Sequence, residues 1–200
     1  MRLMTATMKG LLTAAAVALA TATSSALAAD TYDFDTAHTD VVFNISHFGY
    51  SDTWGRFNEV DGTVTLDKDD LAGSSVEVTI QAASIDTNHK KRDEHLRSAD
   101  FLNVKEFPTI TFKSTKVDPT GEMTAKVTGD LTIHGTTKPV ILDVTVNKIA
   151  PHPLPDYNNV ETAGLSARTT IKRSEFGVDA FVPAVGDEME IIIEVEAFKQ

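Results

Sequence analysis

Apolar and polar residues alternate along most of the chain after residue 30. Between Val76 and Ala82 every second residue is apolar, and the residues between them are Glu77, Thr79 and Gln81. A period of two places one set of side chains on a buried face, so this window predicts a β-strand. The same pattern predicts further strands in residues 41–48, 53–67, 109–117, 127–133, 140–146, 165–171 and 189–198.

Several short segments between these strands have the composition of turns. Asp118–Gly121 (DPTG) and His134–Pro139 (HGTTKP) predict reversals of the chain. Asp61-Gly62 is compatible with a hairpin turn or with a bulge in one long strand, and we favour the bulge. Residues 150–160 contain three prolines and no periodicity, which predicts a loop, and Arg173–Gly177 predicts one helical turn ending at the glycine.

One long window, Thr87–Phe112, breaks the alternation. Its charged segment predicts a single helix over Asn88–Ser98, in which Leu96 is the one strong hydrophobe. Such a helix needs apolar surface from elsewhere, so we expect it to lie on the sheet as a lid or plug. The expected anchors are Phe101, Leu102 and Phe107.

Strands of this number, joined by turns and accompanied by one helix, predict a mainly β fold. We expect an extended antiparallel, lipocalin-like β-barrel of about eight strands with the helix packed against it, because closure removes exposed strand edges. A barrel of this size is either filled by its own side chains or holds one small ligand. Small inward residues (Ala82, Gly129 and Ala167) fit close packing or room for a thin chain, and periodicity does not decide between them.

The N-terminal segment has the pattern of a secretory signal peptide. Basic Arg2 and Lys9 precede an apolar run, and Ala26-Leu27-Ala28 offers a small-x-small cleavage site. The apolar run is shorter than the ~20 residues of a spanning helix. We therefore expect residues 1–28 to be removed and residues 30–200 to form a single domain in the periplasm.

Charge and cysteine content exclude several classes of function. After loss of Arg2 and Lys9, 16 basic residues face 29 acidic ones, a net charge of −13. Such a chain is not expected to bind nucleic acid or anionic head groups. The chain has no cysteine, which excludes thiol redox chemistry, disulfides and lipid attachment through a thiol.

The sequence holds none of the common catalytic motifs. The six histidines are scattered, so we expect no metal site and no cofactor, and assign them to strand ends and turns. Arg92, Asp93 and His95 fit an acid–base reading, because a carboxylate can orient a histidine. The favoured interpretation is structural: Arg92 and Asp93 tie the lid to backbone groups at the barrel rim.

Five ordered blocks resemble the YceI family of secreted, lipocalin-like proteins, often called polyisoprenoid-binding. They are DTAHTDVVFNISHFGYSDTWGRF (35–57), SIDT with RDEHLRSADFLNVKEFPTITF (84–112), GDLTIHGTTKPV (129–140), IKRSEFGV (171–178) and VGDEMEI (185–191). The resemblance implies an antiparallel barrel around a long apolar tunnel. It also implies an amphiphilic ligand with a long hydrocarbon tail, such as an isoprenoid quinone or a fatty amide, and a homodimer. Asn88 stands where the family usually has Gly, and Asn is the residue that next best tolerates positive φ.

We therefore expect a non-catalytic periplasmic carrier of a long-chain amphiphile, without stable membrane insertion. The alternatives are an enzyme that uses His95 and Asp93 on an amphiphilic substrate, and a filled barrel that serves a membrane redox protein. Polar residues expected near the ends of the cavity are His38, His47, Arg92 and Asp93. The residues expected to line it are Phe43, Ile45, Phe57, Val78, Ile80, Phe112, Leu131, Ile133, Leu142, Val144, Phe176, Phe181, Ile191 and Ile193.

Overall fold

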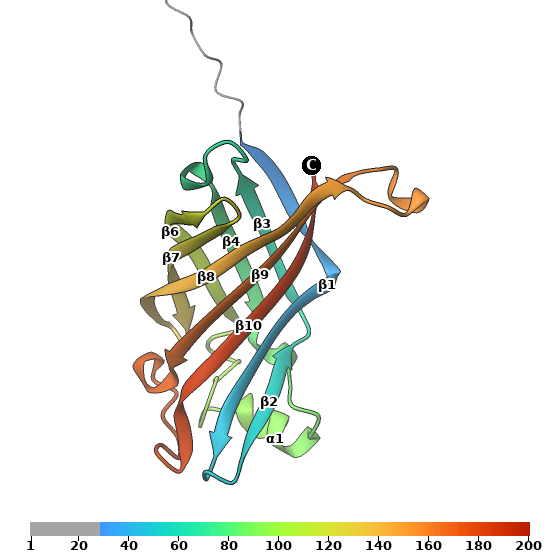
Figure 1. Ribbon diagram of the computed structural model, residues 1–200. Coiled ribbons are helices and arrows are strands. Elements are labelled where there is room, and N and C mark those ends of the chain that lie inside the picture. Colours follow the sequence, from blue (N-terminus) through green and yellow to red (C-terminus); the bar gives the residue numbers. More distant parts are fainter. Residues whose placement is uncertain (1–28) are drawn as a thin grey trace, which may run out of the picture.

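The computed structural model describes residues 29–200, which form one antiparallel sheet closed by pairing of its first and last strands (Figure 1). The predicted signal peptide, residues 1–28, lies outside the described residues. No helix within residues 29–200 has the length and apolar character needed to cross a bilayer. The elements in chain order are β1 (Asp30–His47), β2 (Ser51–Phe57), β3 (Val60–Leu66), β4 (Ser75–Gln81), β5 (Ile85–Asp86), α1 (Lys90–Leu96), β6 (Thr109–Gly121), β7 (Thr124–Ile133), β8 (Thr136–Pro151), β9 (Glu161–Lys172) and β10 (Val185–Lys199).

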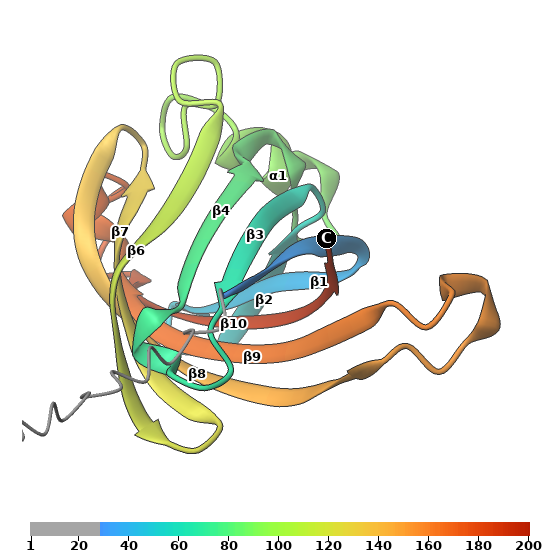
Figure 2. The ribbon, with the colours of Figure 1, turned by 90° about the horizontal axis from the view of Figure 1, so that it is seen from above.

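The ten strands form the wall of an eight-stranded barrel. β2 and β3 pair with successive halves of β1, and β5 and β4 pair with β2 and β3. β2 and β3 therefore share one position in the wall, and β4 and β5 share the next. The ten strands thus occupy eight positions, and the predicted barrel of about eight strands is confirmed. Viewed along its axis, the barrel is ringed by strands, and the β8–β9 connection projects to one side (Figure 2).

The inward face follows the predicted alternation. In β7, Val127 and Leu131 are buried, while Lys126 and Asp130, which directly precede them, are exposed. The buried residues form two hydrophobic clusters, and the larger includes residues of α1 and the segment after it, such as Leu96, Phe101 and Leu102. α1 lies at the lower end of the barrel in Figure 1, near β2, as expected of a lid.

The predicted helix Asn88–Ser98 is too long. α1 spans only Lys90–Leu96, because Asn88 has a φ of 58° and cannot continue a right-handed helix. His89 is the N-cap, and its ring accepts a hydrogen bond from the amide of Arg92 at 3.2 Å. The expectation that Asn88 adopts positive φ at this turn is confirmed.

Asp61-Gly62 forms neither the hairpin nor the bulge expected from the sequence. Both residues lie inside β3, and the interruption between β2 and β3 falls at residues 58–59. The glycine serves close strand approach, because a Cβ at Gly62 would lie 2.7 Å from the carbonyl oxygen of Glu77 and 2.9 Å from the ring of Phe34.

Two other predicted turns shift when the strands pair. Asp118–Gly121 belongs to β6, and the reversal occurs at Glu122–Met123, because pairing of buried Val117 with buried Val127 fixes the register. The turn between β7 and β8 needs only His134 and Gly135, with φ of 51° and 72°. Positive φ at both residues is typical of the type I′ hairpin turn.

Two expectations for short segments are confirmed. Residues between Pro151 and Glu161 form the predicted proline-rich loop, which contains a 3₁₀ turn at Pro155–Tyr157. Arg173–Phe176 forms the predicted helical turn and ends at Gly177, whose φ is 76°.

Candidate ligand-binding cavity

The barrel encloses a cavity of about 510 Å³ lined almost entirely by apolar side chains. Inward residues of all ten strands supply its wall, and Arg92, His95 and Leu96 of α1 close part of one end. The inward face of each strand is apolar because the chain alternates, so the same pattern that builds the sheet also builds the cavity. Side chains therefore do not fill this barrel.

Sixteen of the eighteen residues selected from the sequence lie in the cavity wall. Whether they contact a ligand stays a prediction. Those in the wall are Phe43, Ile45, His47, Phe57, Val78, Ile80, Arg92, Phe112, Leu131, Ile133, Leu142, Val144, Phe176, Phe181, Ile191 and Ile193.

Small inward residues serve close packing at two positions. A Cβ at Gly129 would lie 2.3 Å from the ring of Phe112, and a Cβ at Gly55 would lie 2.3 Å from the ring of Phe43. The two aromatic rings occupy the space that these glycines leave. By contrast Ala167 lies directly in the cavity wall.

His38 does not reach the cavity, contrary to expectation. The register of β1 against β10 shifts between Phe34 and Thr39, so residues 35–38 leave the wall. The exposed ring of His38 lies 2.6 Å from Asp35 Oδ2, outside the barrel. Burial alone would raise the pKa of Asp35, but hydrogen bonds from His38 and the Ala37 amide outweigh it and lower the pKa. The same hydrogen bond raises the pKa of His38.

Asp35, His38 and Glu196 place one ligand atom each within 4.8 Å of one another. Two carboxylates and one imidazole are a donor set for a divalent transition metal. The same three residues are equally well explained as an Asp35–His38 ion pair beside the carboxylate of Glu196. The expectation of no metal site stays a prediction.

Asp93 is the second selected residue that lies away from the cavity. It is buried, and its Oδ1 accepts hydrogen bonds from the amide (2.9 Å) and hydroxyl (2.5 Å) of Thr87. Arg92 donates from Nε to the Thr87 hydroxyl and from an Nη to the Thr87 carbonyl, both at 2.7 Å. Arg92 and Asp93 thus both bond to Thr87, the residue before the turn into α1, which is the structural role expected for them.

Arg97, which the sequence reading did not select, completes the attachment of α1. Its guanidinium donates to the carbonyls of Ala83 (2.6 Å), in the 3₁₀ turn after β4, and Ile85 (2.5 Å), the first residue of β5. No local pattern distinguishes Arg97 from the other charged residues of the helix. Its role depends on backbone carbonyls that lie more than ten residues earlier in the chain.

The pair required by the enzymatic alternative is not formed. His95 Nε2 lies 2.9 Å from Asp100 Oδ2, and Asp93 is engaged by Thr87. The His95 ring packs edge-on against Phe101 (5.0 Å between centroids) and Phe181 (6.2 Å) at the rim of the cavity. The geometry therefore places His95 in an aromatic rim and gives it no oriented partner in Asp93.

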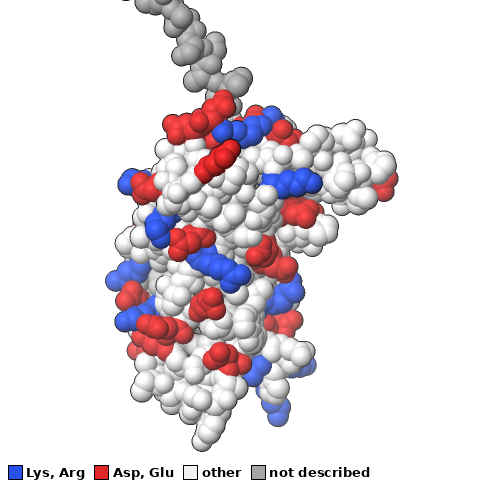
Figure 3. All heavy atoms as spheres, in the orientation of Figure 1, with Lys and Arg blue, Asp and Glu red and all other residues white. Residues whose placement is uncertain are grey.

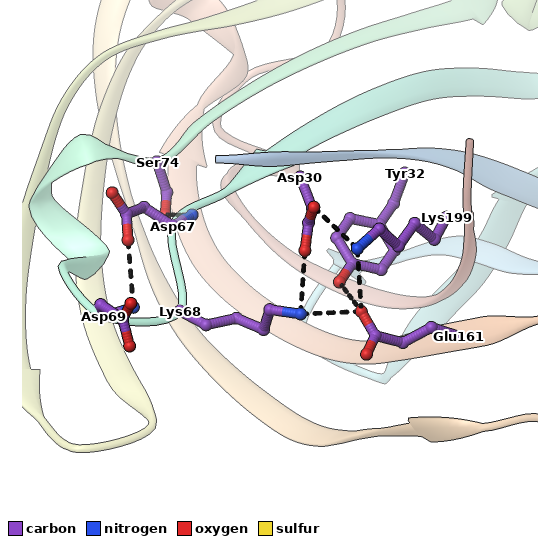
Figure 4. A network of polar contacts seen from close by, with 8 residues as sticks. All are labelled: Asp30, Tyr32, Asp67, Lys68, Asp69, Ser74, Glu161 and Lys199. Atoms are coloured by element: carbon purple, nitrogen blue, oxygen red, sulfur yellow. Dashed lines mark hydrogen bonds and ion pairs between the residues drawn. The ribbon is translucent and has the colours of Figure 1, made fainter. Parts of the chain in front are cut away.

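Charged residues form a network at the end of the barrel opposite α1 (Figure 4). The fully buried Tyr32 donates its hydroxyl to Glu161 Oε1 at 2.6 Å. Lys68 Nζ joins Glu161 (2.8 Å) to Asp30 (2.9 Å), and Lys199 Nζ lies 2.7 Å from Asp30. Burial and the bond to Glu161 raise the pKa of Tyr32 to about 12. The sequence reading missed this network, because its members come from both ends of the domain.

Arg173 holds the chain between β9 and β10. Its buried guanidinium donates to four backbone carbonyls, those of Val178, Ala180, Val185 and Gly186, at 2.7–3.0 Å. Burial lowers the pKa of Arg173, although Asp187 and Asp179 oppose the shift. The guanidinium thereby fixes the loop that carries Phe181 into the cavity rim.

A family profile described as YceI-like domain matches residues 32–197. A UPF0312 protein of Ectopseudomonas mendocina is 40% identical over 96% of this chain and 100% of its own length. A UPF0312 protein of Pectobacterium carotovorum is 42% identical over 96% of this chain and 98% of its own length.

Solved structures share the fold. The crystal structure of BcnA from Burkholderia cenocepacia superposes with a TM-score of 0.73 at 28% identity, covering 82% of this chain and 98% of BcnA. The YceI protein of Campylobacter jejuni gives 0.70 at 33% identity, covering 83% and 96%. A polyisoprenoid binding domain from Saccharophagus degradans gives 0.66 at 13% identity, covering 86% and 99%, and shows likeness of fold alone.

Proposed function

This chain belongs to the YceI family, and from that premise and its cavity we propose that it is a non-catalytic binding protein for a long-chain amphiphile. The ligand class is an isoprenoid, such as a polyprenyl compound or an isoprenoid quinone, or a fatty acid or amide. The protein acts in the periplasm, a location that rests on the signal-peptide pattern of residues 1–28.

The observation that carries the proposal is the enclosed apolar cavity of about 510 Å³. This volume falls within the range of roughly 300–1,000 Å³ typical of small-molecule sites. Its wall matches a hydrocarbon tail, since each buried methylene contributes about 0.8 kcal/mol. Ten methylenes supply about 8 kcal/mol, which corresponds to a dissociation constant of about 1 μM before ordering costs.

Polar groups at the α1 end suit an amphiphile rather than a plain hydrocarbon. His47, Arg92 and His95 lie in the wall at the exposed rim and can donate hydrogen bonds to a head group. A domain of the same fold is named for polyisoprenoid binding. The absence of a bond between His95 and Asp93 speaks against the enzymatic alternative.

A direct loading assay tests the proposal. The chain without residues 1–28 is mixed with a ubiquinone, a polyprenol or a fatty amide delivered from cyclodextrin, and bound compound is measured after gel filtration. We expect one molecule of at least one of these compounds per protein. No retention of any of them would favour a barrel that serves another protein without carrying a ligand.

A further inference from the structure

Two chain reversals form one rim at the α1 end of the barrel. The β1–β2 turn carries Phe48, and the β9–β10 connection carries Phe181. The amide of Phe48 donates to the carbonyl of Ala184 at 2.9 Å, so the two reversals lie side by side. Both rings line the cavity and yet are more than half exposed, at 52% and 58%. The cavity therefore meets solvent between these two segments.

The two reversals are apolar, although Arg92 and His95 of α1 border the same end of the cavity. Residues 46–51 (SHFGYS) and 180–186 (AFVPAVG) contain no acidic or basic residue apart from His47. Tyr50 is 92% exposed and Val182 is 36% exposed, beside the two phenylalanines. We call Phe48, Tyr50, Phe181 and Val182 the apolar tip.

The opposite end of the molecule is rich in charged residues. Asp30, Lys68, Glu161 and Lys199 form their ion network there, and residues 67–70 (DKDD) are all charged. Figure 3 shows a group of charged side chains at the upper end, whereas the lowest protrusion of the surface is white, with basic side chains to the right of it. The two reversals thus differ in character from the opposite end of the barrel, whereas α1 beside them carries charged residues.

Backbone conformation keeps the aromatic side chains of the tip where they are. Phe48 and Phe181 have φ of 54° and 62°, in the left-handed region that bulky residues rarely adopt. Such residues are held there by surrounding contacts and gather at functional sites. A strained aromatic residue in each reversal indicates that exposure of these rings is built into the fold.

We propose that the apolar tip docks on a zwitterionic lipid bilayer, so that an amphiphile passes between the membrane and the cavity without crossing water. This proposal deepens the proposed function and rests on it for the cargo. Aromatic residues favour the interfacial region of a bilayer, and a shallow apolar tip can enter it by about 5–10 Å. The acidic chain argues for neutral rather than anionic head groups.

The size of the tip favours a bilayer over a second copy of the chain. From aromatic side-chain areas of about 150–250 Å², its four residues expose on the order of 450 Å². A stable dimer buries about 800 Å² on each partner. A bilayer needs no matching surface, and the ligand class proposed here dissolves in it.

The chain carries its own reporter for this contact. Trp54 is the single tryptophan, is 53% exposed, and lies on the outer side of β2 opposite Asn44. With a rise of about 3.3 Å per residue, it lies roughly 10 Å from the turn, at head-group depth when the tip is inserted. Its emission should shift to the blue on docking.

The test uses the chain without residues 1–28 and phosphatidylcholine vesicles, with flotation and Trp54 emission as readouts. The variant Tyr50→Ser/Val182→Ser alters the tip at two residues that do not line the cavity. We expect it to lower the vesicle partition coefficient about tenfold or more. The matched control is Ile141→Ser/Leu154→Ser, whose side chains are 51% and 56% exposed elsewhere on the surface, and we expect it to stay within about twofold.

Ligand loading separates this proposal from the proposed function. Delivered from cyclodextrin, a ubiquinone or polyprenol should bind the tip variant as it binds the parent, while loading from vesicles falls in parallel with flotation. The proposal is overturned if the parent does not float with vesicles or if the tip variant floats equally well. It is also overturned if the tip substitutions instead convert a dimer to a monomer by light scattering.

Discussion

The ring of Phe43 occupies the space above Gly55, its cross-strand partner between β1 and β2. A Cβ at Gly55 would lie 2.3 Å from Phe43 Cζ and within 2.9 Å of two further ring atoms. A glycine on the inner face thus allows an aromatic ring to lie against the wall instead of across the cavity.

Substitution Gly55→Ala should therefore push Phe43 out of its site. We expect a loss of about 1–3 kcal/mol in the free energy of unfolding, the usual cost of overpacking. Urea denaturation measures it. The control is Gly164→Ala, where a Cβ meets nothing closer than 3.9 Å and the change should be neutral or slightly stabilising. Equal stability of the two variants would contradict the packing.

The attachment of α1 makes a prediction at Asp93. Replacing it by Ala removes the acceptor of two hydrogen bonds from Thr87 and leaves those donors buried. We expect a loss of about 3 kcal/mol, together with faster hydrogen exchange of the Thr87 amide. Asp100→Ala, which removes an exposed carboxylate paired with His95, should change stability by less than about 0.5 kcal/mol. If both substitutions cost the same, Asp93 does not anchor the helix.

The extent to which the sequence predicts this molecule follows from how far apart the interacting residues are. Alternation along single strands places Ile191, Ile193 and eleven other selected residues in the cavity wall, because each strand has only two faces. The prediction that His38 lies at the cavity is wrong, because alternation holds only while the register is unbroken. A register shift before Thr39 changes which residues of β1 face inward, and no local pattern announces it.

Contacts between distant segments are what the sequence leaves open. The DPTG segment has turn composition, yet pairing of Val117 with Val127 overrides it. Glu161 meets Tyr32 across 129 residues, and Arg97 meets carbonyls that no pattern in its helix indicates. The exposed rings of the apolar tip were likewise not predicted, because alternation describes strands and not the turns between them.

The ion network predicts the response to acid. Hydrogen bonds from Lys68 and Tyr32 lower the pKa of Glu161, and those from Lys199 and Lys68 lower the pKa of Asp30. A lowered pKa stabilises the fold above the unfolded-state value near 4, and this contribution is lost as pH falls below it. The melting temperature should drop below about pH 4, and less steeply in Glu161→Gln. The exposed Glu188→Gln should keep the parental profile, and identical profiles in both variants would contradict the network.

Tyr32 predicts the response to base. Its pKa is raised to about 12, so its stabilising contribution is complete below about pH 10 and is lost as pH rises toward the folded-state value. Absorbance at the phenolate band, compared between the parent and Tyr32→Phe, should show one tyrosine ionising near pH 12. Ionisation of that tyrosine near its ordinary value of about 10 would mean that the hydroxyl is not held by Glu161.

Filling the cavity should weaken ligand binding while leaving the fold intact. Ala167 of β9 lies in the cavity wall, and the nearby Thr170 is exposed on the outer face. We expect Ala167→Phe to reduce loading of a long-chain amphiphile about tenfold or more, and Thr170→Phe to leave it unchanged. Circular dichroism and melting temperature verify that both variants fold. Parental loading by Ala167→Phe would place the ligand elsewhere.

Native mass spectrometry of the protein purified from its own host shows most directly whether the cavity carries a long-chain amphiphile. We expect a stoichiometric adduct that organic extraction releases as a prenyl or acyl compound. A protein with its bare sequence mass, unchanged after incubation with quinones, polyprenols and fatty amides, would contradict it.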